Sequence, residues 1–195
     1  MPMSHRTPLQ RELILNEETM RTLILQMARE VTLTLDESQL ETLALMGILR
    51  RGKPLADRLA DALHGLLGKR PPVGALSTTL YRDDVRVRLG EPSDKAATYF
   101  DFDVTDRTIL LVDDVLAAGR TIRAAMDEVM DYGRPRCIQL ACLVDRGGRE
   151  LPIQPDYRGW IVHAQPHQWV AVRLKELDGE DAVYVETYAP HEGIT

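Results

Sequence analysis

The feature that most constrains this chain is an apolar run that ends in two adjacent carboxylates. The segment 108–112 reads T-I-L-L-V and is followed at once by Asp113 and Asp114. A short stretch of small residues comes next, and apolar residues then recur at helical spacing from Thr121 onward. The pattern predicts a buried strand over 108–112, a turn, and a helix over 121–132.

This arrangement suits the binding of a phosphorylated sugar. The first backbone N–H groups of a helix have no intrahelical acceptor and can bind a phosphate. Two carboxylates at the end of a strand can bind ribose hydroxyls directly and a hydrated Mg²⁺ ion through water. Adjacent acids also serve as structural caps, but the continuation Gly119-Arg120-Thr121 into a helix favours a binding site. Asp113 and Asp114 are therefore the first candidate functional residues.

Length and composition predict a single α/β domain. The chain has 195 residues, of which 44% are hydrophobic, enough for one compact core. We expect residues 1–10 to form a disordered tail and residues 11–190 to form the domain. No apolar run approaches the ~20 residues that span a bilayer. The first residues lack the apolar centre of a signal peptide, so a cytoplasmic protein without membrane contact is expected.

Charge is unevenly distributed along the chain. The net charge is −6, which argues against a surface that is basic throughout and binds nucleic acid without specificity. Lysine and arginine are nevertheless concentrated in residues 50–88, and acids in residues 176–186. A local basic patch therefore stays open as an interpretation.

Predicted helices and strands alternate along the chain. Helices are expected after the N-cap Asn16 and around Pro54 in a first helical turn. Gly133 is expected to end the helix of residues 121–132 in a left-handed conformation. Further strands are expected over residues 43–49, 73–81, 137–144, 160–163, 170–174 and 183–188, the last two paired with each other. This alternation predicts a mainly parallel sheet with helices on both faces, which binds ligands at the carboxyl ends of its strands.

Three charged segments follow predicted strands and are expected to meet at that edge of the sheet. They are residues 50–52, 113–121 and 145–148. The first contains Arg50 and Arg51, which can bind an anion there. The segment 81–106 is long and polar, which is typical of a mobile functional loop or hairpin.

The sequence contains none of the competing nucleotide motifs. There is no G-x-x-x-x-G-K-[ST], and no G-x-G-x-x-G follows a predicted strand. His163 and His167 have the spacing of metal ligands on a helix, but Pro166 between them prevents that helix. Trp160 and Trp169 can stack on bases, although packing in the core or at its rim is the more common role.

Several segments together resemble one family. L-A-L-M-G-I-L-R-R-G-K-P-L-A-D-R-L-A stands at 43–60, T-L-Y-R-D-D at 79–84 and L-V-D-R-G-G-R-E-L-P-I at 143–153, around T-I-L-L-V-D-D-V-L-A-A-G-R-T at 108–121. The segment with the two acids resembles the phosphoribosyl pyrophosphate loop of type I phosphoribosyltransferases, and the set resembles the PyrR family of pyrimidine operon attenuation proteins. The resemblance implies a type I phosphoribosyltransferase fold, in which helices flank a central, mainly parallel sheet and a flexible loop or hairpin and a small hood region are added.

The resemblance implies both an enzyme and a regulator. The enzyme is a uracil phosphoribosyltransferase, which converts uracil and phosphoribosyl pyrophosphate to UMP and pyrophosphate with Mg²⁺. Family members are also RNA-binding regulators that sense UMP and attenuate transcription of pyrimidine genes. The implied partners are pyrimidine-operon leader mRNA and further copies of the chain, in a homodimer or higher homo-oligomer.

Residue roles are also implied by the resemblance. Asp113 and Asp114 would hold the ribose hydroxyls and, through water and together with the substrate, the magnesium ion. Arg82, in the flexible loop that begins with residues 79–84, would be a third catalytic residue as a charge partner of the leaving group. The implied substrate contacts are Arg50, Arg51 and Gly52 for pyrophosphate, Ala117, Ala118, Gly119, Arg120 and Thr121 for the 5′-phosphate, and Val144, Asp145 and Arg146 near the base and phosphate.

Ala117 and Ala118 depart from the family pattern. The family loop reads D-D-V-L-Y-T-G-R-T, so the alanines replace an aromatic and a hydroxyl residue. Losing a hydroxyl donor to a phosphate costs about 1.5–3 kcal/mol. Arg50 stands where the family has threonine, and residues 159–165 replace the family segment G-K-N-[IV]-P-T-S. Two alternatives therefore stay open, a nucleotide-sensing regulator with degraded catalysis and a phosphoribosyltransferase for another base, such as a purine.

Overall fold

The computed structural model describes residues 7–78 and 98–189. Within them the chain forms strands and helices that alternate for much of its length. In chain order these are β1 (Gln10–Asn16), α1 (Glu17–Thr34), α2 (Glu37–Glu41), β2 (Leu43–Ile48), α3 (Gly52–Leu67), β3 (Val73–Leu76), β4 (Thr108–Leu116), α4 (Arg120–Asp131), β5 (Cys137–Asp145), β6 (Tyr157–Ile161), β7 (Gln168–Arg173), α5 (Lys175–Asp178) and β8 (Ala182–Thr187).

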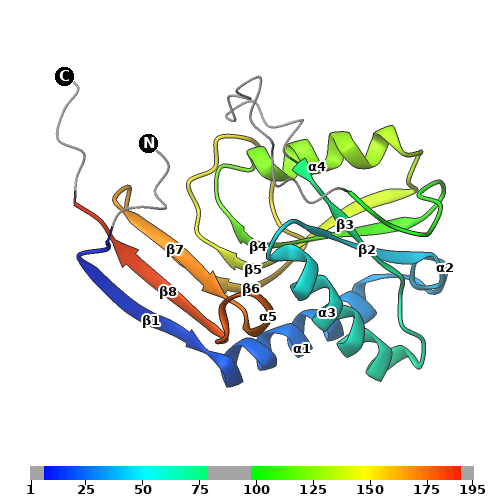
Figure 1. Ribbon diagram of the computed structural model, residues 1–195. Coiled ribbons are helices and arrows are strands. Elements are labelled where there is room, and N and C mark those ends of the chain that lie inside the picture. The colour runs from blue at the N-terminus through cyan, green and yellow to red at the C-terminus, as the bar shows by residue number, and fades with distance from the viewer. Residues whose placement is uncertain (1–6, 79–97, 190–195) are drawn as a thin grey trace.

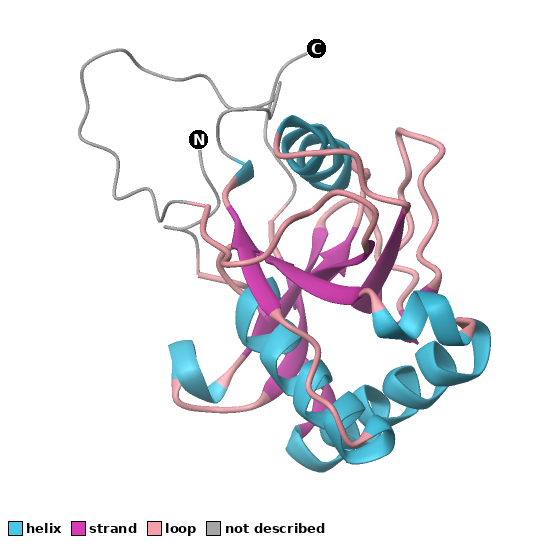
Figure 2. Cartoon of the chain, turned by 90° about the vertical axis from the view of Figure 1, so that its right-hand side faces the viewer, coloured by secondary structure: helices cyan, strands magenta, loops and turns pink. Residues whose placement is uncertain are grey.

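The larger sheet is parallel, with the spatial order β3-β2-β4-β5-β6. Figure 1 shows α4 on one face of this sheet and α1 and α3 on the other, and the turned view in Figure 2 shows helices on both sides of the strands. One apolar cluster joins the sheet to α1 and α3, and a second joins it to α4. The strands read as continuous apolar runs because they are covered on both faces. The predicted α/β fold is confirmed.

The smaller sheet is antiparallel, with the order β1-β8-β7, and corresponds to the expected hood region. The predicted pairing of the last two strands is confirmed, because β7 and β8 pair along their length. The first strand was not predicted. Gln10, the last residue of the segment expected to be a tail, pairs with Thr187, and the Leu9 N–H donates to the Thr187 carbonyl at 2.8 Å. Residues 1–6 lie outside the described residues.

The ends of the two long helices follow from local chemistry. The Asn16 side chain accepts a hydrogen bond from the Thr19 N–H at 2.9 Å, which caps α1 as predicted. Pro54 lies in the first turn of α3, where a missing N–H costs nothing. Gly68 ends that helix with a φ of 72°, a conformation that favours glycine.

The central strand β4 is longer than predicted and contains both acids. It continues to Leu116 instead of ending at residue 112. Its neighbour β2 pairs with it only as far as Val112, whereas β5 pairs with it up to Leu116. Asp113 and Asp114 therefore lie on a part of the strand that has lost its neighbour on one side, and this opens the sheet beside them.

Gly133 does not have the predicted left-handed conformation. It is absent from the residues with positive φ, and the C-cap of α4 is Tyr132 in a right-handed helical conformation. A Cβ at Gly133 would lie 2.7 Å from the Thr105 hydroxyl oxygen. The glycine is thus explained by the close approach of another loop rather than by its own backbone dihedral. The helix itself lies one residue earlier than predicted at each end.

The expected mobile loop falls mainly outside the described residues. Residues 79–97 are not described, and these include Arg82 and the segment 79–84. The chain is described again from Thr98, and Tyr99 forms an isolated antiparallel bridge with Ala75.

Candidate functional site

A cavity of about 740 Å³ opens at the carboxyl ends of β2 and β4, facing the hood sheet. This volume lies within the range of sites for small molecules. The described residues that line it are Ile48, Leu49, Arg50, Arg51, Thr78, residues 113–122, Arg146, residues 169–173, Glu186 and Tyr188. The predicted convergence of three charged segments at one edge of the sheet is therefore confirmed.

The two acids are among the residues that line this cavity. Asp113 is 7% exposed, and its Oδ1 accepts a hydrogen bond from the Asp114 N–H at 2.9 Å. Burial raises the pKa of the Asp114 carboxyl, and a hydrogen bond with Asp113 and the positive charge of Arg51 oppose this rise. Two adjacent, poorly hydrated carboxyls gain from a cation or from hydroxyl donors, which a sugar supplies.

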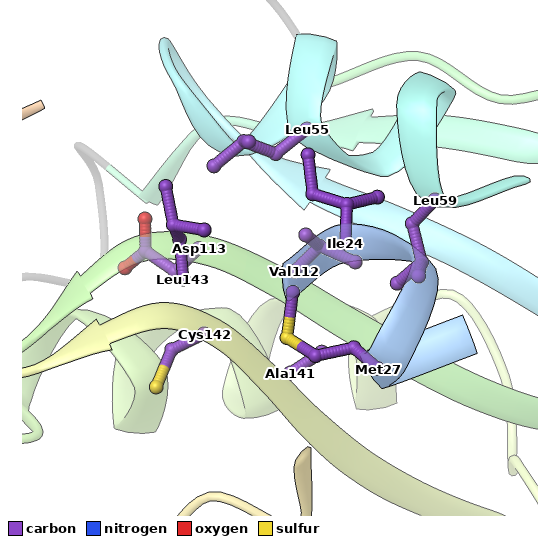
Figure 3. Close-up of a pocket in the computed structure, with 9 residues that line it drawn as sticks. All are labelled: Ile24, Met27, Leu55, Leu59, Val112, Asp113, Ala141, Cys142 and Leu143. Carbon is purple, nitrogen blue, oxygen red and sulfur yellow. The ribbon is translucent and has the colours of Figure 1, made fainter. Parts of the chain in front are cut away.

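The interior behind the acids is apolar. Figure 3 shows Ile24, Leu55 and Val112 among the side chains around a cavity of about 10 Å³, with the Asp113 carboxylate directed away from them. That cavity is near the lower limit for one water molecule, so it reflects core packing and is no ligand site. The apolar floor removes water from one side of the acids.

The turn after β4 leads into the N-terminus of α4 at the cavity. Gly119 has a φ of 92° and is the N-cap of α4, without a side-chain capping bond. Its carbonyl accepts the Arg123 N–H at 2.9 Å. The first N–H groups of α4 have no intrahelical acceptor, and they meet the cavity with the positive end of the helix dipole. This is the geometry of an anion site.

Arg51 lies on the facing side of the cavity and is held by the hood. Its Nη2 donates to both carboxylate oxygens of Asp178, at 2.8 and 3.1 Å. Arg173 donates to the same carboxylate at 3.1 Å. The Nε atoms of both arginines are buried and have no hydrogen-bond partner among the described residues. A ligand with several anionic oxygens would satisfy such donors.

The hood side of the cavity carries an aromatic wall. The Arg146 guanidinium lies 5.7 Å from the centre of the Trp169 ring, within the range of a cation–π interaction. Trp169, for which packing in the core or at its rim was the preferred interpretation, is half-exposed and lines the cavity. Burial lowers the pKa of Arg146. A flat ring could lie against this wall.

Glu186 and Tyr188 are cavity residues that sequence reasoning missed. Glu186 is buried, accepts a hydrogen bond from the Tyr188 hydroxyl at 2.7 Å and pairs with Arg11 at 3.2 Å. The hydrogen bond to Glu186 raises the pKa of the Tyr188 hydroxyl. Glu186 lies opposite Trp169 in the β7–β8 register. The predicted pairing of these strands was the signal that could have placed Glu186 beside the tryptophan.

Three of the predicted substrate contacts do not line the cavity. Gly52 is buried at the start of α3, and Val144 is fully buried in the core. Asp145 is buried and paired with Arg149 at 2.7 Å. The Val144 side chain is thus enclosed by packing, and the Asp145 side chain is held by an internal ion pair. Arg82 lies outside the described residues.

A metal ion at this site would depend on the substrate for ligands. Among the described residues, no group of three or more His, Cys, Asp or Glu side chains could hold a metal. Asp113 and Asp114 nevertheless fit Mg²⁺, which keeps several waters and is commonly bound by one or two carboxylates together with substrate phosphates. No helix in the described part of the chain is long and apolar enough to cross a bilayer.

Comparisons with known sequences cover nearly the whole chain. A family model described as phosphoribosyl transferase domain matches residues 14–177. The protein named Bifunctional protein PyrR from Acetivibrio thermocellus is 46% identical over 173 residues, which is 88% of this chain and 92% of that protein. The protein of the same name from Desulfosudis oleivorans is 44% identical over 188 residues, 96% of this chain and 99% of that protein.

Solved structures share the fold at much lower sequence identity. A hypoxanthine-guanine phosphoribosyltransferase from Bacillus anthracis has a TM-score of 0.66 at 14% identity, covering 92% of this chain and 99% of that chain. A hypoxanthine phosphoribosyltransferase from Staphylococcus aureus has a TM-score of 0.64 at 17% identity, covering 97% and 98%. The architecture is thus that of type I phosphoribosyltransferases.

Proposed function

The chain belongs to the PyrR family of phosphoribosyltransferases, and from this premise we propose that it converts uracil and phosphoribosyl pyrophosphate to UMP and pyrophosphate. One observation carries the proposal. Two carboxylates, the uncapped start of α4 and the arginines Arg50 and Arg51 border a single cavity. This set of groups matches the sugar hydroxyls, the 5′-phosphate and the diphosphate of that substrate.

The two ends of the sugar are bound by different groups in this proposal. Asp113 and Asp114 accept hydrogen bonds from the ribose hydroxyls. The backbone N–H groups of residues 117–121 and the Thr121 hydroxyl bind the 5′-phosphate. Holding both ends fixes the anomeric carbon between the acids and the aromatic wall, and this orientation lowers the entropic part of the barrier.

The leaving group is the diphosphate, and its charge must be stabilised as the bond to the sugar breaks. Arg50 and Arg51 are placed to meet that charge, and preorganised cations act most strongly where water is excluded. Asp113 and Asp114 would hold a hydrated Mg²⁺ ion together with the substrate, and such an ion would supply further positive charge opposite the diphosphate. Trp169 and Arg146 cover the base, which keeps water away from the reactive sugar.

A regulatory activity is the second part of the proposal. The relatives are named bifunctional, and this supports a function besides phosphoribosyl transfer. We expect the chain to bind pyrimidine-operon leader mRNA as a cytoplasmic homodimer, more tightly in the presence of UMP. Titration of such an RNA at rising salt concentration measures this. Absence of affinity at low salt would remove the RNA from the proposal, because phosphate contacts are strongest there.

The enzyme activity is tested with a panel of bases. Purified protein, phosphoribosyl pyrophosphate and Mg²⁺ are incubated with uracil, hypoxanthine, guanine or adenine, and nucleotide formation is followed. Product from uracil alone is expected. Formation of a purine nucleotide instead would mean that the enzyme acts on another base. Binding of UMP without any turnover would mean that the protein is a nucleotide-sensing regulator.

The two acids are tested by charge removal. Asp113→Asn and Asp114→Asn are each expected to lower kcat/KM for phosphoribosyl pyrophosphate about 100-fold or more, since removal of one preorganised group commonly has this effect. Asp61→Asn is the matched control, because Asp61 is an exposed carboxylate of α3 that pairs with Arg70 away from the cavity. Rates of the Asp113 and Asp114 variants equal to that of the control would refute their role.

A further inference from the structure

Arg149 lies behind the turn that presents the 5′-phosphate donors. Its side chain is 15% exposed, and it is not among the residues that line the cavity. A partly buried guanidinium next to this turn that does not line the cavity needs a different explanation from direct substrate contact. Its hydrogen bonds supply one.

The Arg149 guanidinium joins the turn to the loop that follows β5. Its Nη1 donates to the Ala117 carbonyl at 3.0 Å and more weakly to the Leu116 carbonyl at 3.4 Å. Its Nε donates to the Ile153 carbonyl at 2.8 Å. Its Nη2 pairs with the Asp145 carboxylate at 2.7 Å. The planar fork of arginine can make these bonds together, which the single ammonium of lysine cannot do.

The same loop takes up the next carbonyl of the turn. The N–H groups of Glu150 and Leu151 donate to the Ala118 carbonyl at 3.0 and 3.1 Å, and the Arg146 N–H donates to the Leu116 carbonyl at 3.0 Å. Three consecutive carbonyls, those of residues 116–118, are therefore all turned toward the loop of residues 146–153. None of them faces an anion in the cavity, where a carbonyl oxygen would repel it.

The orientation of these carbonyls also determines where the N–H groups point. In a planar trans peptide unit the N–H is directed opposite to the carbonyl of the same unit. The N–H groups of Ala117, Ala118 and Gly119 are thus directed away from the loop, on the side of the cavity that these residues line.

We propose that Arg149 is a positioning residue for the 5′-phosphate site, which orients the backbone donors of residues 117–119 by binding the carbonyls behind them. The inference rests on the proposed function only in requiring that this turn binds a sugar phosphate.

The test separates phosphate binding from the rest of the ligand. Kd values for UMP and uridine, and for IMP and inosine, are measured by calorimetry for the wild-type protein, Arg149→Lys and Arg149→Gln. The lysine variant keeps a positive charge beside Asp145 and is expected to fold. We expect it to weaken binding of the preferred nucleotide about tenfold, with the matching nucleoside unchanged, since one charge-assisted hydrogen bond is worth about that factor. The glutamine variant should weaken it further.

Arg70→Gln controls for the loss of an ion-paired arginine. Arg70 pairs with Asp57 and Asp61 at 3.2 and 2.6 Å and is outside the cavity lining. It should change the melting temperature little and leave nucleotide affinity unchanged. Two results for Arg149→Lys would overturn the proposal: equal losses of affinity for nucleotide and nucleoside, or a nucleotide affinity within twofold of wild type. A wild-type protein that binds neither nucleotide more tightly than its nucleoside would also overturn it. Tighter binding of IMP than of UMP would refute the uracil assignment. The role of Arg149 is then tested by the Kd values of its variants for IMP and inosine.

Discussion

Gly52 allows the start of α3 to lie against the centre of the sheet. A Cβ at this position would be 2.3 Å from the Val112 carbonyl oxygen, far inside any normal contact. Gly47, on β2, is equally restricted, because its Cβ would lie 2.4 Å from the Gly52 carbonyl oxygen. The two glycines bring the turn of Arg50 and Arg51 next to the strand that carries the acids. Gly52 was expected to contact the substrate, but the contribution that the structure shows is steric.

Gly52→Ala is expected to displace the start of α3 and with it the two arginines. Overpacking of this kind costs about 1–3 kcal/mol, and the KM for phosphoribosyl pyrophosphate should rise as well. Chemical denaturation and steady-state kinetics measure the two effects. Gly65→Ala is the matched control in the same helix, because nothing lies within 4 Å of a Cβ there. It should stabilise the protein by up to about 1 kcal/mol; a Gly52 variant that behaves like this control would contradict the steric argument.

The short helix α5 and the turn after it fasten the hood to α3. Arg58 of α3 donates to Glu176 and to Asp181, and the Lys175 N–H also donates to Asp181 at 2.9 Å. The Asp181 side chain is 8% exposed, so its pairing is shielded from water. Asp178, from the same element, binds Arg51. Through these ion pairs, α5 and the turn after it connect the hood with the turn of Arg50 and Arg51.

Asp181→Asn is expected to lower the free energy of unfolding by about 1–3 kcal/mol at neutral pH, since it weakens hydrogen bonds to a charged group. Denaturant titration measures this. Asp61→Asn, which removes an exposed partner of Arg70, should change stability by less than about 1 kcal/mol. Equal effects of the two substitutions would show that burial of Asp181 is irrelevant.

The same pair predicts a pH dependence. Although burial opposes ionisation, hydrogen bonds from Arg58 and from the Lys175 backbone hold the pKa of Asp181 below its usual value. A carboxyl whose pKa is lower in the folded state stabilises the fold above its unfolded pKa and loses that contribution as the pH falls toward the folded value. Between about pH 5 and pH 3 the wild type should therefore lose more stability than Asp181→Asn. Parallel stability curves for the two proteins would contradict this.

One apolar core reaches from the main sheet into the hood. Leu15, Val170, Val172, Leu174 and Val183 of the hood region belong to the same buried cluster as residues of α1, α3, β4 and β5. The fold also brings the basic first half of the sequence next to the acidic segment near its end, because Arg51 and Arg58 pair with acids of that segment. At these positions the concentration of basic residues does not produce a basic patch.

This shared core predicts that the hood and the main sheet unfold together. Calorimetry should give a single transition with equal calorimetric and van't Hoff enthalpies, as for a two-state domain. The ratio of the two enthalpies is the measurement, made without nucleotide. A separate transition at lower temperature, in which the fluorescence of Trp169 changes before the main unfolding transition, would contradict this. It would show that the hood is an independent unit and that residues 11–190 are not a single domain.

The sequence by itself determined most elements of the main sheet, the helices α1, α3 and α4 beside it, and the chemistry of the central turn. The apolar run before Asp113, the cap at Asn16 and Pro54 in a first helical turn are each properties of a few consecutive residues, and local periodicity and capping act at that range. The same range covers the unit from β4 to α4, so the strand, turn and helix that we propose to bind the phosphate were predictable from their residues. The resemblance to one family followed from similarly short segments.

Only the tertiary structure decided which side chains meet across that site. Arg51 and Asp178 are 127 residues apart, and Arg149 and Ala117 are 32 apart. Many arginines and carboxylates in this chain could pair equally well, and the choice depends on strand order and register, which no short segment encodes. The end of the β2–β4 pairing at Val112 likewise depends on packing between strands. For this reason the local sequence predicts the turn between β4 and α4, and the fold alone decides which side chains hold that turn in place.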